Sequence, residues 1–240
     1  MRTSKYVLVV GSDATGLVFT SLLLQRFDYH ICNANTAREA LEMANAVVPA
    51  LIITDLKPAG MTASQMIEVL RKNPLTAAVP VIFKLDQFTP EIEKKCREAG
   101  AAACVRKPVE PEELYRVVQS VIEPVPREHI RITTRMSLVM NNEPRACVTG
   151  ECVTMLSSRG MYVRTRNPYP VKTKFPIRIT LDNRNIAAEA KVIYSHTEFE
   201  GPFGEPGMGL YFSNIRPEDQ ERLQQYINDE VTSGLTPGKK

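Results

Sequence analysis

The sequence has few residues of the kinds that form disulfides or metal sites, and it has no long hydrophobic run. Its five cysteines are odd in number and include no Cys-x-x-Cys pair, which indicates reduced thiols in a cytoplasm rather than disulfides. Its three histidines are scattered without the spacing of metal ligands. The apolar run Val7–Val10 is too short for a signal peptide or a membrane span. We therefore expect a cytoplasmic protein with neither a metal centre nor a membrane segment.

The composition is that of an ordinary globular protein, with 240 residues of which 43% are hydrophobic and 24% charged. This length suits two domains of about 100–120 residues, each with its own core. The net charge of +3 is unevenly distributed. Residues 1–123 carry 14 basic and 14 acidic side chains, residues 127–191 carry 12 and 5, and residues 192–240 carry 4 and 8. The middle of the chain is therefore expected to form a positive surface, which suits a phosphate-bearing partner.

Residues 5–122 alternate short apolar runs with helical patterns. Runs such as Leu51–Ile53 and Val81–Phe83 suit parallel strands that are covered on both faces. Strand and helix alternating over about 120 residues predict five βα units in an open, doubly wound α/β sheet. Functional sites in such sheets lie at the carboxyl ends of the strands, where this sequence places Asp55 and Lys107.

A connector at residues 124–131 separates this pattern from the next. Two prolines in its first three residues fix φ and remove backbone donors, which predicts the end of a helix and a stiff extended segment. Arg127, Arg131 and Arg135 then follow at a spacing of four. Arginine pairs bidentately with phosphate and stacks on flat rings, so a hinge of this kind could read an anionic ligand. The alternative is an ordinary, solvent-exposed start of a strand.

Beyond the connector the apolar period changes to two. Residues 175–181, 186–194 and 207–212 alternate apolar with other side chains, which predicts a small, all-β antiparallel barrel. A helix that begins at Pro217 carries a single apolar stripe, and we expect this stripe to cap the mouth of the barrel. The last residues, 233–240, are expected to be a disordered tail. The expected domains are therefore 1–123 and 132–232, joined by the connector.

The strand ends of the first domain resemble the receiver domain of bacterial response regulators, and this resemblance covers residues 5–122. It implies that Asp55 is placed as the acceptor of a phosphoryl group from a histidine kinase and that Lys107 contacts the phosphate. The family also has two acids after its first strand that hold Mg²⁺, and Gly11-Ser12 occupy that place here. Mg²⁺ is not expected with one carboxylate left, since the ion prefers several carboxylate and water ligands.

Two further positions depart from the receiver pattern. Leu85 occupies the place of a hydroxyl residue at the end of the fourth strand, and Cys104 the place of an aromatic switch residue. Asp13, one step after the missing acids, is better placed to cap the next helix. Two interpretations follow for Asp55: a working phosphoacceptor, or a carboxylate held in a fixed ion pair by Lys107 with a contribution from Lys84. We favour the ion pair.

The second domain combines several motifs that together resemble a PilZ domain over residues 127–230. The motifs are Arg127-x-x-x-Arg131, Ser157-Ser158-Arg159-Gly160, Pro206-Gly-Met-Gly-Leu-Tyr-Phe212 and the helix at 217–223. The resemblance implies a receptor for cyclic di-GMP in which Arg127 and Arg131 contact phosphates and stack on guanine. Ser157 and Gly160 match a second motif, D/NxSxxG, and Met155 stands at its acid or amide position. Arg135 and Arg159 are further candidates for the nucleotide site, with plain solvent-facing charge as the alternative.

The resulting hypothesis is a non-enzymatic, cytoplasmic signalling protein in which a degenerate receiver domain precedes a PilZ domain. Cyclic di-GMP would bind the PilZ domain and be relayed by interdomain rearrangement to a protein partner, since no catalytic constellation or helix-turn-helix is visible. The alternative is a protein-interaction adaptor in which both the phosphoacceptor and the nucleotide sites are degenerate. Nucleic-acid binding ranks last because the basic residues are not interleaved with stacking aromatics. The downstream partner is not specified, and a homodimer is compatible with the sequence.

Overall fold

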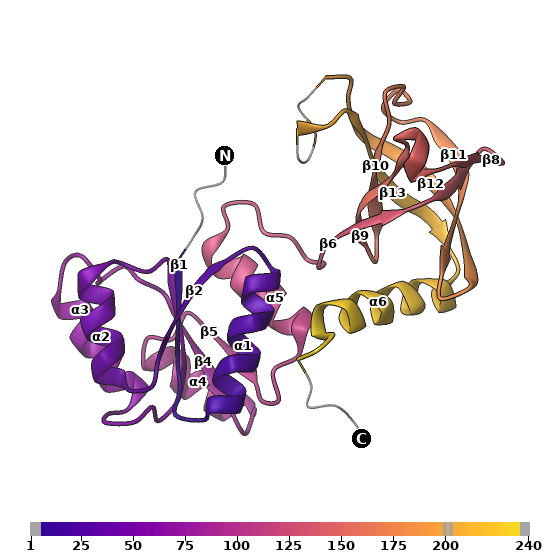
Figure 1. Ribbon diagram of the computed structural model, residues 1–240. Coiled ribbons are helices and arrows are strands. Elements are labelled where there is room, and N and C mark those ends of the chain that lie inside the picture. Colours follow the sequence, from indigo (N-terminus) through magenta and orange to yellow (C-terminus); the bar gives the residue numbers. More distant parts are fainter. Residues whose placement is uncertain (1–5, 199–200, 202–203, 236–240) are drawn as a thin grey trace. The chain divides into compact units, whose positions relative to one another are not determined.

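The computed structural model describes residues 6–198, 201 and 204–235, and it divides the chain into two compact units (Figure 1). The first unit holds the chain up to Glu128 together with the residues from Thr232 onward. The second unit holds His129–Val231. The chain therefore changes unit inside the connector that the sequence predicted. Of the predicted tail, residues 233–235 form a turn and residues 236–240 lie outside the described residues.

The first unit is a doubly wound sheet, as predicted. Its five strands are all parallel and follow the order β2-β1-β3-β4-β5. Its helices and strands are, in chain order, β1 (Tyr6–Val10), α1 (Ala14–Arg26), β2 (His30–Ala34), α2 (Ala37–Ala46), β3 (Leu51–Asp55), α3 (Ala63–Lys72), β4 (Val81–Leu85), α4 (Pro90–Glu98), β5 (Ala103–Arg106) and α5 (Pro111–Ile122).

Helices cover both faces of this sheet, which explains why its strands are apolar throughout. In β1, Leu8 and Val10 point to the face that packs against α2, α3 and α4. Val7 and Val9 are equally buried and point to the opposite face, because side chains alternate along a strand. Figure 1 shows α1 and α5 together on one side of the sheet and α2 and α3 on the other. The carboxyl ends of the strands are left open to carry a site.

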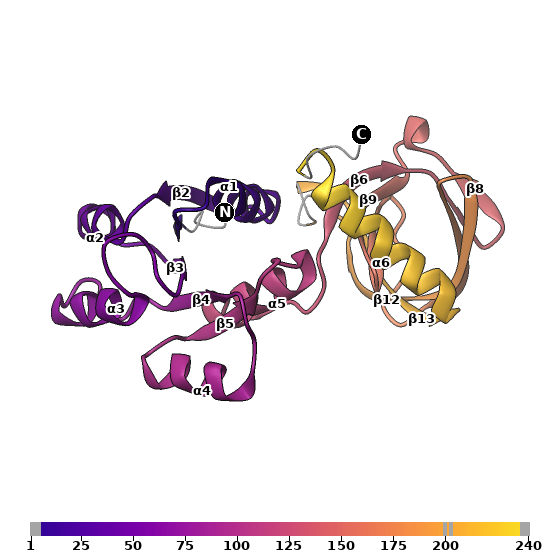
Figure 2. The ribbon, with the colours of Figure 1, turned by 90° about the horizontal axis from the view of Figure 1, so that it is seen from below.

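The second unit is a curled antiparallel sheet followed by a helix, which confirms the predicted fold (Figure 2). Its eight strands follow the order β6-β9-β10-β13-β12-β11-β7-β8. Its elements are β6 (Ile132–Met136), β7 (Leu138–Met140), β8 (Glu143–Arg145), a short 3-10 turn (Cys147–Thr149), β9 (Cys152–Ser157), β10 (Gly160–Arg164), β11 (Lys174–Leu181), β12 (Arg184–His196), β13 (Gly207–Ile215) and α6 (Pro217–Thr232).

The core of the second unit lies on the inner side of the curled sheet. Every second residue of β11 is buried there, from Phe175 to Leu181, as the alternation predicted. Leu223 of α6 is fully buried in the same cluster, so the apolar stripe of this helix does cover the core of the sheet. Among the described residues, no helix is both long enough and apolar enough to cross a membrane.

Two-residue turns in which both residues have positive φ connect two of the strand pairs. Asp182 and Asn183, with φ of 46° and 62°, join β11 to β12. Asn141 and Asn142, with φ of 50° and 65°, join β7 to β8 in the same way. A hairpin turn in which both central residues have positive φ matches the twist of the flanking strands, and Asn and Asp tolerate this conformation better than most residues.

One expectation about the core was wrong. The alternation in 186–194 placed Tyr194 on the same face as Ile186 and Val192. A β-bulge between Val192 and Tyr194 shifts the register of β12 against β13, so that Tyr194 lies opposite Gly209. An extra residue at a bulge breaks the strict alternation of side chains. Tyr194 is consequently absent from the buried core cluster and lines a pocket on the outer side of the sheet.

The packing of α6 generates a prediction about stability. Leu223→Ala removes a fully buried side chain from the core and should destabilise the second unit by about 2–5 kcal/mol. Glu221→Ala, at an exposed position two residues earlier on the same helix, should change stability by less than about 0.5 kcal/mol. Chemical denaturation followed by circular dichroism measures both. Equal stability of the two variants would show that α6 does not belong to the core.

Candidate functional site

The strand ends of the first unit gather charged side chains around Asp55. Asp55 ends β3, and Lys84 lies opposite it in the neighbouring strand β4. Lys107, directly after β5, places its Nζ 2.7 Å from Asp55 Oδ1, and Lys84 Nζ lies 3.6 Å from the same oxygen. Lys107 also reaches Asp86 at 3.3 Å. The structure thus brings Asp55 together with Lys107 and Lys84, the two lysines that the favoured interpretation placed around it.

The two lysines differ in their surroundings. Lys84 is 3% exposed, and this burial lowers the pKa of its ammonium group, an effect that the charge of Asp55 opposes. Burial also acts to lower the pKa of Lys107, but hydrogen bonds and charge from Asp55 and Asp86 outweigh it and raise that pKa. A buried charge is stable only when it is paired. Asp55 and Lys84 therefore need each other, and Lys107 closes the pair toward solvent.

The residues around Asp55 do not fit a magnesium ion. At Gly11, after β1, a Cβ atom would lie 2.9 Å from Asp55 Oδ2, so the absence of a side chain lets the carboxylate approach the backbone. Asp13 caps α1, as predicted, by accepting hydrogen bonds from the backbone N–H groups of Thr15 (3.2 Å) and Gly16 (3.0 Å). Asp55 faces two ammonium groups and Asp86 pairs with one of them, which differs from the oxygen-rich set that Mg²⁺ requires.

This arrangement predicts that Asp55 is not phosphorylated by a small phosphodonor in the presence of Mg²⁺. Transfer onto a carboxylate needs a divalent ion to neutralise the phosphoryl oxygens, and the two lysines occupy the surroundings of Asp55 instead. Intact-mass spectrometry after incubation with acetyl phosphate should show the unmodified chain. A stable added phosphoryl group that disappears in Asp55→Asn would contradict the prediction.

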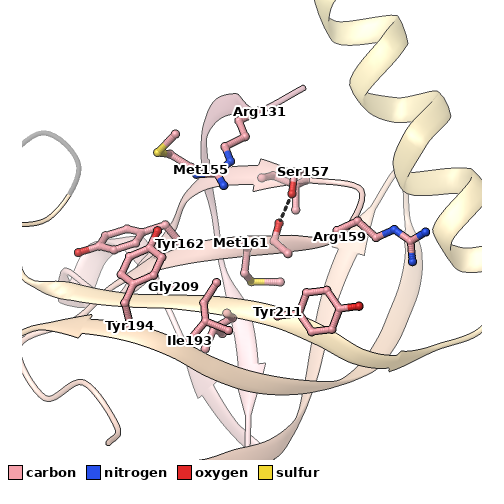
Figure 3. A pocket seen from close by; sticks show the side chains of 13 residues that line it. Arg131, Met155, Ser157, Arg159, Met161, Tyr162, Ile193, Tyr194, Gly209 and Tyr211 are labelled. Carbon is pink, nitrogen blue, oxygen red and sulfur yellow. Dashed lines mark hydrogen bonds between the residues drawn. The ribbon is translucent and has the colours of Figure 1, made fainter. Parts of the chain in front are cut away.

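The second unit has a pocket on the outer side of its curled sheet (Figure 3). Its volume of about 110 Å³ is below the roughly 300–1,000 Å³ of pockets that enclose a drug-sized ligand. A ligand as large as a dinucleotide would therefore lie partly on the open surface. The lining comes from the residue before β6 and from β9, β10, β12 and β13, and consists of Arg131, Met155, Leu156, Ser157, Arg159, Gly160, Met161, Tyr162, Ile193, Tyr194, Gly209, Leu210 and Tyr211.

Ser157 and Gly160 shape the hairpin at the rim of the pocket. The Ser157 hydroxyl donates a hydrogen bond of 3.0 Å to the carbonyl oxygen of Gly160, across the two-residue turn between β9 and β10 (Figure 3). A Cβ atom at position 160 would collide with the carbonyl oxygen of Leu210 in β13. Both residues therefore have a structural role in the sheet that does not depend on a ligand.

Arg131 and Met155 lie beside each other on the same side of the pocket as Ser157 (Figure 3). Met155 is half-buried in β9, opposite Thr133 of β6 and Tyr162 of β10. Arg131 is exposed and forms no ion pair with any carboxylate of the described residues. A guanidinium without an anionic partner, next to an apolar thioether, is well suited to receive a phosphate or a carboxylate from a ligand.

The other three predicted arginines have different surroundings. Arg159 lines the pocket, but its guanidinium points to α6 (Figure 3). There the Gln220 amide oxygen can accept hydrogen bonds of 3.0 Å from Nε and 3.3 Å from Nη1. Arg135 does not line the pocket, and its charge opposes the rise in pKa that burial causes at the Cys147 thiol. Arg127 belongs to the first unit. The pocket thus gathers five of the seven predicted nucleotide-site residues, without Arg127 and Arg135.

The sequence interpretation missed the aromatic part of the lining. The rings of Tyr162 and Tyr194 stack with centroids 6.2 Å apart, and the Tyr162 hydroxyl donates to the Glu205 carbonyl oxygen at 3.0 Å. Ile193 and Tyr211 add apolar surface that is 48% and 43% exposed. Tyr211 could have been found because it is an aromatic residue on the outward side of the alternation in 207–212. Tyr194 could not, because the bulge that exposes it leaves no mark in the sequence.

The electrostatic character of the pocket is simple. Among the described residues, its lining includes two arginines and no acidic side chain. Tyrosine rings and aliphatic side chains form the rest of the surface, together with the Ser157 hydroxyl. An anionic ligand with a flat ring would find a cation and an apolar surface side by side, which is the combination that arginine and aromatic residues provide for nucleotides.

Comparison with known proteins divides the chain in the same way. Residues 7–119 match the response regulator receiver domain family, and residues 126–229 match the PilZ domain family. A two-component response regulator of Arabidopsis thaliana is 33% identical over 48% of this chain and 21% of its own length. A probable cyclic di-GMP phosphodiesterase of Vibrio cholerae is 31% identical over 43% of this chain, in the receiver part, and 23% of its own length. These matches span about a quarter or less of the two relatives.

A solved structure also matches about half of this chain. A response regulator from Chloroflexus aurantiacus is 27% identical, and the match covers 50% of this chain and 98% of that one, with a TM-score of 0.48.

Proposed function

We propose that this chain, which consists of a response regulator receiver domain followed by a PilZ domain, binds cyclic di-GMP and passes that signal to a protein partner. The two domains make it a signal-transduction protein of the two-component type, and both families are regulatory rather than catalytic. We propose that it works in the cytoplasm without enzymatic activity. The pocket on the PilZ domain is the proposed nucleotide site, with Arg131, Met155, Ser157, Arg159 and Gly160 at its edge.

The observation that carries this proposal is Arg131, which has no carboxylate partner among the described residues, beside a pocket to which these residues contribute no acidic side chain. A cyclic dinucleotide has two phosphates and two flat bases, so it needs cations and apolar ring surfaces close together. Arg131 supplies the cation, and Tyr211 and Ile193 supply exposed apolar surface within the same lining. Because the pocket is small, we expect only one base edge to enter it while the remaining ligand lies on the surface.

In this proposal, Arg127 of the connector is the second arginine that contacts the nucleotide, together with Arg131. Arg127 and Arg131 are separated by three residues but belong to different compact units. A ligand held by both guanidinium groups would restrain the connector between them. We propose that this restraint changes how the receiver and PilZ domains are oriented and that the partner recognises the change.

A second candidate function is a protein-interaction adaptor that no longer binds the nucleotide. The structural roles of Ser157 and Gly160 favour it, because a sheet that needs these residues would keep them after the ligand was lost. The thioether of Met155, at the acid or amide position of the motif, is a poor hydrogen-bond acceptor and agrees with this alternative. Nucleotide binding by the purified chain, measured by calorimetry, separates the two functions directly.

Arg131→Ala tests the nucleotide site. The substitution removes an exposed cation that no described carboxylate pairs with, so cyclic di-GMP binding should weaken by at least about tenfold while the fold is unchanged. Arg178→Ala is a matched control, because it removes an exposed arginine from the same curled sheet outside the pocket, and it should leave the affinity unaltered. Isothermal titration calorimetry measures both affinities. If Arg131→Ala binds cyclic di-GMP as tightly as the parent, the nucleotide site lies elsewhere on the chain.

Met155→Asn tests the departure from the PilZ motif. An amide offers guanine the acceptor that a thioether lacks, so binding should tighten by about five- to thirtyfold if the pocket is otherwise intact, or about 1–2 kcal/mol. Met155→Asp should gain less, because the new carboxylate would lie beside Arg131 and pair with it. Met155→Leu, which adds no acceptor, should gain nothing. The adaptor function predicts that none of the three variants binds cyclic di-GMP.

Unchanged affinity of Met155→Asn in a parent that already binds tightly would have a different meaning. Met155 would then pack against the base as a polarisable apolar surface, and its placement at the guanine-reading position of the motif would be wrong.

A further inference from the structure

One residue of the first unit holds both ends of the proline-rich strap that leads out of α5. The strap runs from Glu123 to Arg127. The backbone carbonyl of Gln119 accepts a hydrogen bond from the Glu123 N–H at 3.0 Å. The side-chain Oε1 of the same Gln119 accepts one from the Arg127 N–H, also at 3.0 Å. Gln119 therefore fixes the strap where it leaves the helix and again at the first arginine of the proposed ligand pair.

The side chain of Gln119 is buried and fully used. It is 3% exposed, and its Nε2 donates a hydrogen bond of 2.9 Å to the hydroxyl of Tyr29, which donates in turn to Glu123 Oε1 at 3.4 Å. The orientation of the amide is unambiguous because the backbone N–H of Arg127 can only donate. Burial, followed by the charge of Glu123, raises the pKa of Tyr29, which keeps its phenol protonated as a donor. A buried amide oxygen that loses its partner is costly, so the Arg127 bond is favoured.

The strap itself has few other means of attachment. Pro124 and Pro126 carry no N–H group, and Val125 between them is 80% exposed. The two prolines also restrict φ, so a restraint at one end of the strap is transmitted along its length rather than absorbed. Within residues 124–127, the hydrogen bond at Arg127 is therefore the main link to the body of the first unit.

We propose that Gln119 is a positioning residue that ties the arginine-bearing connector to the receiver domain. This inference rests on the proposed function for its ligand, cyclic di-GMP, and it adds the route by which binding reaches the receiver domain. A nucleotide captured by Arg127 and Arg131 restrains the backbone of Arg127. Through its N–H group that restraint passes to Gln119, and from there to Tyr29 and the carboxyl end of α5. Without the Gln119 side chain, the restraint ends in the connector.

The first part of the test uses the full chain without ligand. Gln119→Leu removes the acceptor, and the connector peptide that contains Arg127 should exchange its amide hydrogens about fivefold faster, as expected for the loss of one hydrogen bond. Trypsin should also cleave after Arg127 faster. Tyr29→Phe keeps the Gln119 acceptor and should have a smaller effect. Ser120→Ala, at the next and exposed position of α5, loses only a bond to its own helix and should have none.

The second part repeats the hydrogen-exchange measurement with cyclic di-GMP. In the parent and in Ser120→Ala, ligand should slow exchange in the connector, in the carboxyl end of α5 and around Tyr29. In Gln119→Leu the slowing should stop at the connector and the PilZ pocket, although ligand still binds. A variant whose connector exchanges like the parent without ligand would overturn the anchor. Protection that still reaches α5 in Gln119→Leu would overturn the route.

The two proposals fail in distinguishable ways. If neither parent nor variant binds cyclic di-GMP, the proposed function fails, whereas the measurement without ligand still decides whether Gln119 holds the connector. A circular dichroism melt of Gln119→Leu accompanies both parts. If this variant unfolds, Tyr29→Phe provides the test instead. Faster amide exchange in the connector of Tyr29→Phe than in the parent supports the hydrogen-bond network through Gln119. An exchange rate equal to that of the parent, with and without ligand, contradicts it.

Discussion

A charge withdrawn from water needs an opposite charge close to it, and this requirement gives the two domains different characters. In the receiver domain, Asp55 and the buried ammonium of Lys84 satisfy each other, and Lys107 completes the pair. The charges of that site are held in internal ion pairs. On the PilZ domain, Arg131 stays at the surface and has no carboxylate partner within the part of the chain that the structure describes. Its charge is available to a ligand, which is why the proposed function is placed there.

The pocket around Arg131 depends on irregularities in an otherwise regular sheet. Bulges interrupt the pairing of β9 with β10 and of β12 with β13. The second of these turns Tyr194 outward to stack on Tyr162, over the backbone of β13. The hairpin at Ser157 and Gly160 closes one side of the same pocket. Residues that match a binding motif thus also maintain the sheet, and their presence by itself does not distinguish a nucleotide receptor from an adaptor.

The connector combines two kinds of constraint. Its prolines restrict the backbone without providing hydrogen bonds, and Gln119 provides the bond that the prolines cannot. Arg127 is therefore held by the receiver domain through its backbone while its side chain is left for other interactions. In the proposed function, this separation of roles within one residue would let the receiver domain respond to a ligand bound by its neighbour.

The sequence alone determined the architecture, because periodicity is a local property. Unbroken apolar runs such as Val81–Phe83, which alternate with helical patterns, are typical of strands covered on both faces, and the alternation from Phe175 to Leu181 is typical of a strand covered on one. The short strands from β6 to β10 were not identified in this way, since several have three residues or contain bulges that disturb the period. The resemblance to the PilZ motifs implied that Arg131, Ser157 and Gly160 share a site, and the structure brings them to one pocket.

Tertiary structure decided which charges are paired and which side chains reach the pocket. Asp55 and Lys84 are 29 positions apart, and only the parallel register of β3 and β4 sets them opposite each other. Arg159 was a further candidate beside the motif residue Arg131, and packing directs it to Gln220 of α6. Gln119 has no motif at all and acquires its role from Tyr29 and Arg127. The physical reason is common to these cases: pairing and burial depend on distances in space between residues remote in the chain, and a local pattern contains no such distances.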